Sequence, residues 1–297
     1  MSKLEQENTN AARQIQWFPG HMAKTRRKIT EDLKLVDIVL ELLDARIPAS
    51  SSNPVLREII QNKPRVVVLN KSDLADPKQT MRWIAKYREL GLSAVQVESK
   101  TGKGLPALYR AVREELKEQI AGWERKGMSG RPIRVMVLGI PNVGKSSIIN
   151  RMLIGGGAGR AEVRDKPGVT RQNRWFTIGK GFELLDTPGV LWPKFENPIV
   201  GERLAFTGAV KDEILDTEGL AGRLLEVLSG LYPQSLENRY KLKLSNEHLA
   251  GHELLELVGR KRGMLISGGE IDTDRAAITV LDEFRGGKLG AISLEWP

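Results

Sequence analysis

The chain has 297 residues, of which 40% are hydrophobic and 5% aromatic, and it contains no cysteine. This length and apolar content suffice for a sizeable core in two domains, while the cysteine count excludes disulfides and thiolate metal sites and fits a reducing, cytoplasmic compartment. The formal net charge of +9 leaves two interpretations open, a generally basic protein or a partner of a polyanion such as nucleic acid.

Neither the apolar runs nor the start of the chain indicates a membrane protein. No apolar run approaches the ~18–20 residues that a membrane-spanning helix requires. Residues 1–14 are polar and mix both charges, so we interpret them as a flexible leader and not as a signal or transit peptide.

Strands and helices alternate along the first two thirds of the chain. The predicted strands are 36–46, 65–70, 93–99, 131–140, 174–179 and 182–189, and the predicted helices are 56–63, 78–90, 105–127 and 145–153. The last two strands are joined by Gly-Lys-Gly, which favours a hairpin. The alternation predicts a mostly parallel α/β sheet flanked by helices over residues 15–197.

The pattern changes after about residue 198. Successive amphipathic segments follow at 222–233, 235–244, 246–263 and 272–287. They predict a second, all-helical domain over residues 198–297.

Residues Gly139–Ser146 match the phosphate-loop pattern G-x-x-x-x-G-K-[ST]. A β-branched strand precedes the pattern and a helix follows it, which is the context that the pattern requires. We expect Lys145 to bridge the β- and γ-phosphates of a nucleotide and Ser146 to ligate Mg²⁺. The backbone amides that we expect to face the phosphates belong to Asn142, Val143, Gly144, Lys145, Ser146 and Ser147.

Two further positions have the spacing of nucleotide switches. Asp186 begins the sequence D-T-P-G about 40 residues beyond the phosphate loop, where it would hold Mg²⁺ through water, and the amide of Gly189 would sense the γ-phosphate. Thr170 lies between the two motifs, where a switch threonine completes the coordination of Mg²⁺ and the γ-phosphate. The alternatives are an ordinary turn and an ordinary loop threonine.

The predicted strand 65–70 ends in a second nucleotide motif, Asn70-Lys71-Ser72-Asp73. Asp73 would accept hydrogen bonds from guanine N1–H and its exocyclic amine. Adenine lacks both donors, so its binding would leave a buried carboxylate unpaired, and we expect GTP and GDP to be preferred to ATP. Asn70 and Lys71 would brace the loop and cover the base. A polar turn is the alternative.

Glu98-Ser99-Lys100 follows the next predicted strand. It resembles the S-A-K motif of GTPases, in which a backbone amide contacts guanine O6. Ser99 stands where alanine is usual, a change that a backbone contact tolerates. Glu98 stands where serine is usual, so the side-chain brace of this motif is not expected in its ordinary form.

The motifs occur in the order base, base, phosphate, switch, switch, whereas GTPases ordinarily begin with the phosphate loop. A sheet can keep its fold with this order if the N- and C-termini of the ordinary arrangement are joined and new termini are created at a surface loop. We therefore predict a circularly permuted P-loop GTPase domain, in which residues 120–132 join the old ends and the second switch leads directly into the helical domain.

This order resembles that of the circularly permuted GTPases. The elements Trp17–Met22 (W-F-P-G-H-M) and Asp44–Arg46 (D-A-R), together with the helical tail, resemble the ribosome biogenesis GTPase A family in particular. The resemblance implies a GTPase that docks on the immature large (50S) ribosomal subunit, contacting rRNA and ribosomal proteins, helps a late assembly step and is activated by that particle. We expect a monomer.

The position after D-T-P-G often carries a glutamine that orients the attacking water, but here Val190 and Leu191 follow. Intrinsic hydrolysis should therefore be slow, and our hypothesis is that His21 orients the water when RNA holds its segment. The alternative is that His21 contacts RNA or caps a helix. His248 and His252 have zinc-ligand spacing but lack an apparent third ligand, so we expect them to be structural or solvent-facing.

Asn142 and the basic residues leave further alternatives open. Asn142 resembles the phosphate-loop asparagine of potassium-activated GTPases and would hold K⁺ between phosphates, or it only forms the turn. The cations form an RNA-binding face or solvated surfaces; they are Lys24, Arg26, Arg27, Lys28, Arg239, Lys241, Lys243, Arg260, Lys261 and Arg262. Alternative functions are an RNA-binding scaffold and a protein-directed switch, in which GTP only sets conformation.

Overall fold

The computed structural model describes residues 19–60, 63–155, 163–164, 175–179, 181–185, 197–210, 216–244 and 249–297, with side chains except those of 19–23, 155, 163 and 164. The chain divides into two compact units. The α/β unit comprises described residues within Gln16–Pro193 together with Ser293–Pro297, and the helical unit comprises described residues within Lys194–Ile292. The sequence predicts a helical domain over all of 198–297, whereas Ser293–Pro297 belong to the α/β unit.

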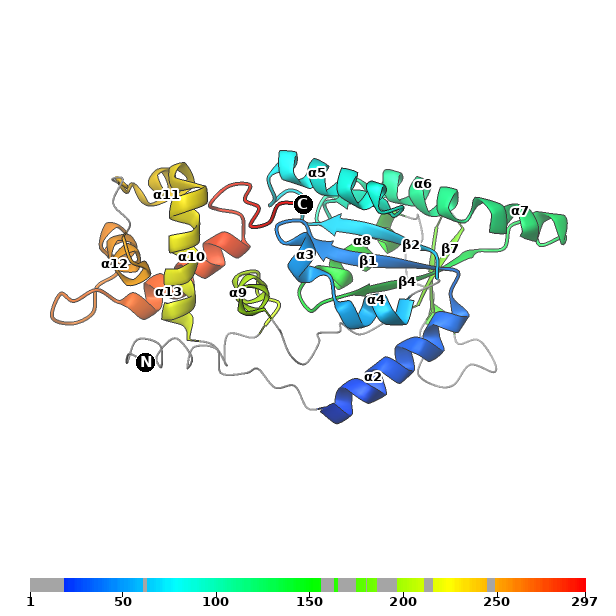
Figure 1. Ribbon diagram of the computed structural model, residues 1–297, viewed down its shortest axis with the longest axis horizontal. Helices are drawn as coiled ribbons and strands as arrows, with labels where there is room; N and C mark the ends of the chain where they lie inside the picture. The colour runs from blue at the N-terminus through cyan, green and yellow to red at the C-terminus, as the bar shows by residue number, and fades with distance from the viewer. Residues whose placement is uncertain are drawn as a thin grey trace. The chain divides into compact units, whose positions relative to one another are not determined.

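The α/β unit is built on a 7-stranded sheet in the order β3-β2-β1-β4-β7-β6-β5 (Figure 1). Its strands are β1 (Ile38–Asp44), β2 (Arg65–Asn70), β3 (Ser93–Val97), β4 (Ile133–Gly139), β5 (Val163–Arg164), β6 (Trp175–Ile178) and β7 (Phe182–Leu185). The pairs along β3-β2-β1-β4-β7 are parallel, and β6 is antiparallel to both β7 and β5. The mostly parallel sheet and the β6–β7 hairpin confirm the predictions made from the sequence.

The helices of this unit include each of the four predicted from the sequence, one of them in two parts. They are α2 (Pro19–Asp32), the 3-10 helix η1 (Leu33–Leu35), α3 (Pro48–Ser51), α4 (Pro54–Ile60), α5 (Pro77–Glu89), α6 (Leu105–Glu115), α7 (Lys117–Arg125) and α8 (Lys145–Gly155). The single helix predicted over 105–127 is wrong, because it divides at Leu116 into α6 and α7. No residue of α7 is buried, so no core contact holds it in line with α6.

Helices cover both faces of the sheet. Side chains of α2 and α4 pack on Val39 and Met136, and α5 packs on Leu43. These three positions share one face, because Val39 pairs with Met136 and alternate residues of a strand point the same way. The ring of Tyr109 in α6 lies 5.1 Å from that of Phe182, which points to the opposite face. All seven residues of β1 are buried, as expected for a central parallel strand.

The helical unit contains α9 (Pro198–Phe206), α10 (Thr217–Leu231), α11 (Pro233–Tyr240), α12 (Gly251–Lys261) and α13 (Thr273–Arg285). α10 packs on both α12 and α13. The approach of α10 and α12 is close at Gly222 and Gly251, because a Cβ added to Gly251 would lie 2.6 Å from the carbonyl carbon of Gly222. Within the described residues, no helix of the chain has the length and apolar composition needed to cross a membrane.

A buried carboxylate ties three helices of this unit together. Glu283 of α13 accepts hydrogen bonds from Arg239, with Nε at 3.0 Å, and from Nη2 of Arg262 at 3.0 Å. Burial would raise the pKa of Glu283, but its hydrogen bonds and the two arginines outweigh this and lower it. Arg239 and Arg262 were candidates for contacting RNA, and the structure engages both guanidinium groups with Glu283.

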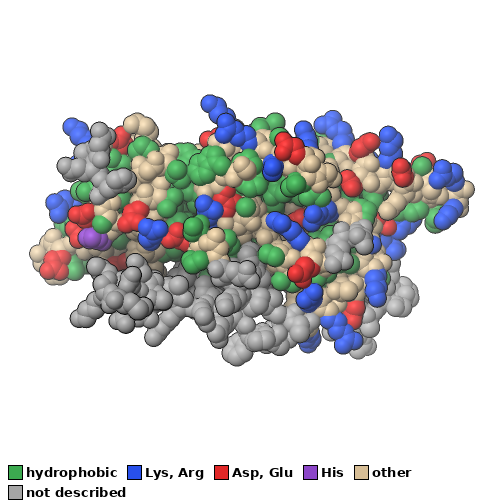
Figure 2. Space-filling view, in the orientation of Figure 1, with side chains coloured by type: hydrophobic (Ala, Val, Ile, Leu, Met, Phe, Trp, Pro, Cys, Tyr) green, Lys and Arg blue, Asp and Glu red, His purple; other side chains and the backbone are tan. Residues whose placement is uncertain are grey.

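Basic side chains at the surface are interspersed with acidic ones over the face shown in Figure 2. In α2, Arg26 pairs with Glu58 at 3.4 Å and Arg27 pairs with Glu31 at 3.0 Å, all with exposed side chains. Exposed pairs contribute only ~0–1 kcal/mol, so these arginines can exchange their partners for a polyanion at little cost.

Candidate functional site

Four loops with candidate site residues leave the same edge of the sheet. β1, β2, β3 and β4 are neighbouring parallel strands, so their carboxyl ends lie side by side. Polar loops follow these ends at 44–46, 70–73, 98–104 and 139–146. In open α/β sheets, ligands bind in the crevice outside this edge, so the topology brings the predicted base-binding and phosphate-binding motifs together.

Asn70 connects three of these loops. Its Nδ2 donates to the carbonyl oxygen of Val143 at 2.7 Å, and its Oδ1 accepts from the amide of Ser99 at 3.3 Å. Asn70 is fully buried, and a Cβ added to Gly144, where φ is +98°, would overlap its Nδ2. Glycine is therefore needed here both for its backbone conformation and for the space that it leaves.

The phosphate loop has the conformation that its motif predicts. It runs from β4 to the start of α8, with Asn142 at φ 55° and Gly144 at φ 98°. Nζ of Lys145 donates to the carbonyl oxygens of Ile140 at 2.7 Å and of Gly139 at 3.2 Å. Burial lowers the pKa of Lys145 to about 8. The ammonium therefore lies within the loop on neutral carbonyl partners, which an anionic phosphate would outcompete.

A buried ion pair between Lys71 and Asp44 anchors the loop with the guanine motif. Nζ of Lys71 lies 3.0 Å from Oδ2 of Asp44, whose side chain is 2% exposed. Arg46 binds the same carboxylate, with Nε 2.9 Å from Oδ1 and Nη2 2.8 Å from Oδ2. Asp73 itself is exposed and Ser72 partly so, which leaves the Asp73 carboxylate open to a ligand.

Charges and burial oppose each other in this pair. Burial would raise the pKa of Asp44, but the Arg46 and Lys71 cations outweigh it and hold that pKa well below its ordinary value. Burial lowers the pKa of Lys71, while Asp44 raises it in part. The carboxylate is therefore ionised at neutral pH and fixes the position of the Lys71 ammonium.

Glu98 replaces the usual brace of its loop with another. Its carboxylate accepts from Oγ1 of Thr101 at 3.0 Å and from Nζ of Lys103 at 2.8 Å. These hydrogen bonds lower the pKa of Glu98. Arg151 of α8 also donates to the carbonyl oxygen of Thr101. The Glu98–Lys103 loop is therefore held by its own side chains and by α8. These contacts take the place of the serine brace that the S-A-K motif ordinarily supplies.

Several predicted site residues lie outside the described part of the chain. They are Thr170, Asp186, Gly189, Val190, Leu191 and His248, and for His21 only its backbone position in α2 is described. Ser146 and Ser147 are exposed at the first turn of α8, and His252 is exposed on α12. The described residues thus contain the base side and the phosphate loop of the predicted site.

The roles of Asp44, Arg46 and Arg151 were not predicted from the sequence, in which D-A-R after β1 indicated only the family resemblance. The sequence shows only an acidic residue at the end of a strand. That this position lies between the two nucleotide motifs follows from the sheet order, in which β1 adjoins both β2 and β4.

Comparisons with known proteins agree with this geometry. A family model described as 50S ribosome-binding GTPase matches residues 134–245. The chain is 48% identical over 283 residues to ribosome biogenesis GTPase A of Bacillus cereus, covering 95% of this chain and 94% of that protein. The protein of the same name from Thermotoga maritima is 30% identical, with 95% of both chains covered.

The fold is similar to solved structures as well. The GNP-bound crystal structure of YlqF from T. maritima matches with a TM-score of 0.65 and 27% identity, over 92% of this chain and 98% of that one. Its GDP-bound structure matches with the same TM-score and 28% identity, over 91% and 99%. Because relatives at nearly half identity span almost the whole chain and the sheet has the permuted motif order, the chain belongs to the ribosome biogenesis GTPase A family of P-loop GTPases.

Proposed function

We propose that this chain hydrolyses GTP while bound to the immature large (50S) ribosomal subunit, promotes a late maturation step there, and is stimulated by that particle. The family establishes the coarser statement, a GTPase of ribosome assembly that binds guanine nucleotides. The description of the matching family model and the exposed cations of α2 support a large-subunit partner. We further propose that the chain acts in the cytoplasm as a monomer.

One observation carries the nucleotide part of this proposal, the hydrogen bond from Asn70 to the carbonyl oxygen of Val143. It joins the predicted base-binding loop to the predicted phosphate loop across 73 positions of sequence. A single nucleotide can then contact both, with its base at Asp73 and its phosphates at Lys145. The amide of Ser99, held by Asn70, is the proposed donor to guanine O6.

Mg²⁺ fits the residues on the phosphate side. Ser146 presents an exposed hydroxyl at the start of α8, and hydroxyl and carboxylate oxygens are the ligands that this hard cation prefers. Thr170 is the proposed further ligand, and Asp186 is proposed to hold the ion through water. The ion would neutralise charge between the phosphates, while Lys145 holds them in place. The proposed K⁺ ligand, Asn142, has an exposed side chain on the same loop.

His21 is proposed to orient the attacking water when α2 engages the particle, since Val190 and Leu191 have no group for this task. A His21→Ala variant should bind GDP as the unaltered protein does and lose most of its particle-stimulated turnover. Full stimulated turnover in that variant would assign His21 to RNA contact or helix capping instead.

The test of the proposed function is GTPase turnover with and without purified large subunits, in potassium and in sodium buffers. We expect slow intrinsic turnover and stimulation by the particle, greater in potassium if Asn142 holds the ion. Absence of stimulation would favour the scaffold or the protein-directed switch. Particle binding that weakens steeply with salt would then indicate the scaffold, and salt-insensitive binding the switch.

A substitution at Asp73 tests the base contact directly. Asp73→Asn replaces an acceptor by a donor, so it should reject guanine and favour xanthine, which has a carbonyl oxygen in place of the exocyclic amine. Competition between GDP and xanthosine diphosphate measures this exchange. A variant that still prefers GDP would contradict the role of Asp73.

A further inference from the structure

The last five residues of the chain, Ser293–Pro297, follow the helical unit in sequence but pack within the α/β unit. Ser293, Leu294 and Glu295 are 0%, 2% and 3% exposed. Three buried residues in a terminal segment without helix or strand indicate specific docking, because chain ends are mobile unless tied down. We call Ser293–Pro297 the C-terminal tail.

The tail is hydrogen-bonded to two segments of the α/β unit, one after β1 and one directly after the loop that carries Asp73. At the first segment, the amide of Leu294 donates to the carbonyl oxygen of Arg46 at 2.8 Å. At the second, the amide of Asp76 donates to Oγ of Ser293 at 3.1 Å. Arg46 follows β1 and Asp76 caps α5, so the tail links the end of β1 to the start of the helix that follows the guanine motif.

Glu295 anchors the tail to the chain beyond Arg46. Its carboxylate accepts from the amides of Ala49 at 2.6 Å and Ser50 at 3.1 Å, and also from Oγ of Ser50. These donors belong to the short helix α3 after β1. Oγ of Ser51 in that helix accepts from the amide of Asp44 at 3.0 Å. The tail carboxylate thus fixes the turn that presents Asp44.

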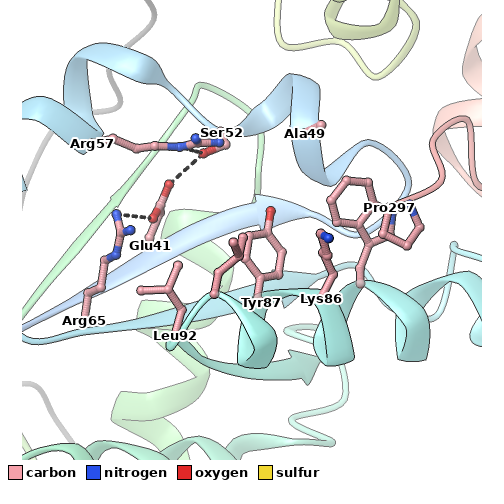
Figure 3. Close-up of a pocket in the computed structure, with 11 residues that line it drawn as sticks. Glu41, Ala49, Ser52, Arg57, Arg65, Lys86, Tyr87, Leu92 and Pro297 are labelled. Carbon is pink, nitrogen blue, oxygen red and sulfur yellow. Dashed lines mark hydrogen bonds and ion pairs between the residues drawn. The ribbon is translucent and has the colours of Figure 1, made fainter.

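The end of the tail lies against α5, the helix that follows the guanine motif. Nε1 of Trp83 donates to the carbonyl oxygen of Glu295 at 3.2 Å. Pro297 borders a pocket of ≈ 360 Å³, together with Trp83, Lys86 and Tyr87 of α5 (Figure 3). Across this pocket Glu41 pairs with Arg65 and accepts from Ser52, so these three polar groups already have partners.

A continuous set of bonds leads from the tail to the guanine motif. The backbone of Arg46 holds Leu294, its guanidinium binds Asp44, and Asp44 pairs with Lys71. Lys71 has φ 57°, a conformation that non-glycine residues adopt only where the surroundings impose it. The ion pair with Asp44 acts on this residue directly, and the tail acts on it through Arg46, which binds the same carboxylate.

We propose that the C-terminal tail and the buried Asp44–Arg46 pair are positioning residues for guanine selection, holding the loop of Lys71 and Asp73 in its base-binding geometry. This inference rests on the proposed function, in which Asp73 contacts guanine. The tail's residues touch no nucleotide themselves. They act through Arg46, Asp44 and Asp76.

Guanine discrimination separates positioning from plain stabilisation. Inosine diphosphate lacks the exocyclic amine that Asp73 is proposed to bind, so the ratio of its Kd to that of GDP reports the geometry of Asp73. A variant that only lowers the folded fraction weakens both ligands by one factor and leaves the ratio unchanged. A variant that loosens the loop weakens GDP more and brings the ratio towards one.

The experiment compares deletion of Ser293–Pro297 and Glu295→Gln with the unaltered full-length chain. Glu270→Gln, the same change at an exposed carboxylate of the helical unit, is the matched control. We expect GDP affinity to fall about tenfold on deletion and several-fold in Glu295→Gln, with a lower ratio in both. Glu270→Gln should match the unaltered chain.

Two results would contradict the positioning role of the tail, and a third would contradict the proposed function. Unchanged GDP affinity in both tail variants overturns the positioning role, and so does an equal loss for both ligands. If the deletion does not fold, Glu295→Gln gives the same answer by itself. An unaltered chain that binds GDP no better than inosine diphosphate or ADP would instead contradict the proposed function, whatever the tail does.

Discussion

Replacement of Asn70 by alanine should separate the two halves of the nucleotide site. The substitution removes the hydrogen bonds to the carbonyl oxygen of Val143 and from the amide of Ser99. Both groups belong to buried residues, so the smaller side chain leaves them without their partner. Contacts elsewhere in the sheet are unaffected, because Asn70 is the last residue of β2.

The expected loss follows from these two groups. Each buried polar group left unpaired costs ~1–3 kcal/mol, so the free energy of unfolding of the α/β unit should fall by ~2–6 kcal/mol. This is a large part of the ~5–15 kcal/mol that typically stabilises a domain. GDP affinity should fall more than ~10-fold, because the base and phosphate loops no longer share a fixed distance.

Tryptophan fluorescence during urea unfolding measures the free energy of unfolding of the α/β unit. The chain has six tryptophans, and the four that the structure describes, Trp83, Trp123, Trp175 and Trp296, lie in the α/β unit. Asn238→Ala, at an exposed site of α11, is the control and should change stability by less than ~0.5 kcal/mol. If Asn70→Ala behaved like this control and kept its GDP affinity, the bridge would not hold the site together.

The remaining predictions concern pH and packing. Because the folded pKa of Lys145 is about 8 and bound phosphate favours its charged form, GDP affinity should fall about tenfold between pH 7 and pH 9, with a smaller decline in Lys145→Arg measured by titration at each pH. Gly251→Ala should destabilise the helical unit by ~1–3 kcal/mol through its clash with Gly222, whereas Gly230→Ala, whose added Cβ meets nothing within 4 Å, should not. Circular dichroism measures the unfolding of this helical unit. Equal losses of stability in the two variants would contradict the close packing of Gly251 on Gly222. The lowered pKa of Glu283 adds stability that is present above its ordinary pKa of 4.5 and is lost as the pH falls through its folded value, so acid should destabilise this unit less in Glu283→Gln than in the unaltered chain.

The strands were predictable because each is short and strongly apolar. Residues 65–70 and 131–140 are β-branched runs bounded by polar or glycine residues, and the structure places β2 and β4 within them. The helix α9 was missed, although Asn197 caps it through a bond from the amide of Ile199 at 2.9 Å. Its nine residues include Pro198 and Gly201, which weaken a helical pattern judged from sequence alone.

The site was predictable where a motif encodes it and unpredictable where distant segments meet. The phosphate loop carries its own glycines and lysine, so residues 139–146 suffice to identify it. The Asp44–Lys71 pair joins the last residue of β1 to the residue after β2, and Glu295 binds Ser50, 245 positions earlier in the chain. Such contacts depend on sheet order and on the path of the tail, neither of which leaves a local pattern in the sequence.

The permuted order changes what must hold the site together. In this chain the segment from β1 to β3 precedes the phosphate loop, and no strand-to-loop connection links Asp73 directly to Lys145. Side-chain bridges therefore bind the base half to the phosphate half: Asn70 reaches Val143, and Arg151 reaches Thr101. Each bridge pairs one residue before the junction at 120–132 with one after it. Loosening either bridge should impair nucleotide binding before it unfolds the sheet, because β1 and β4 remain paired along their length.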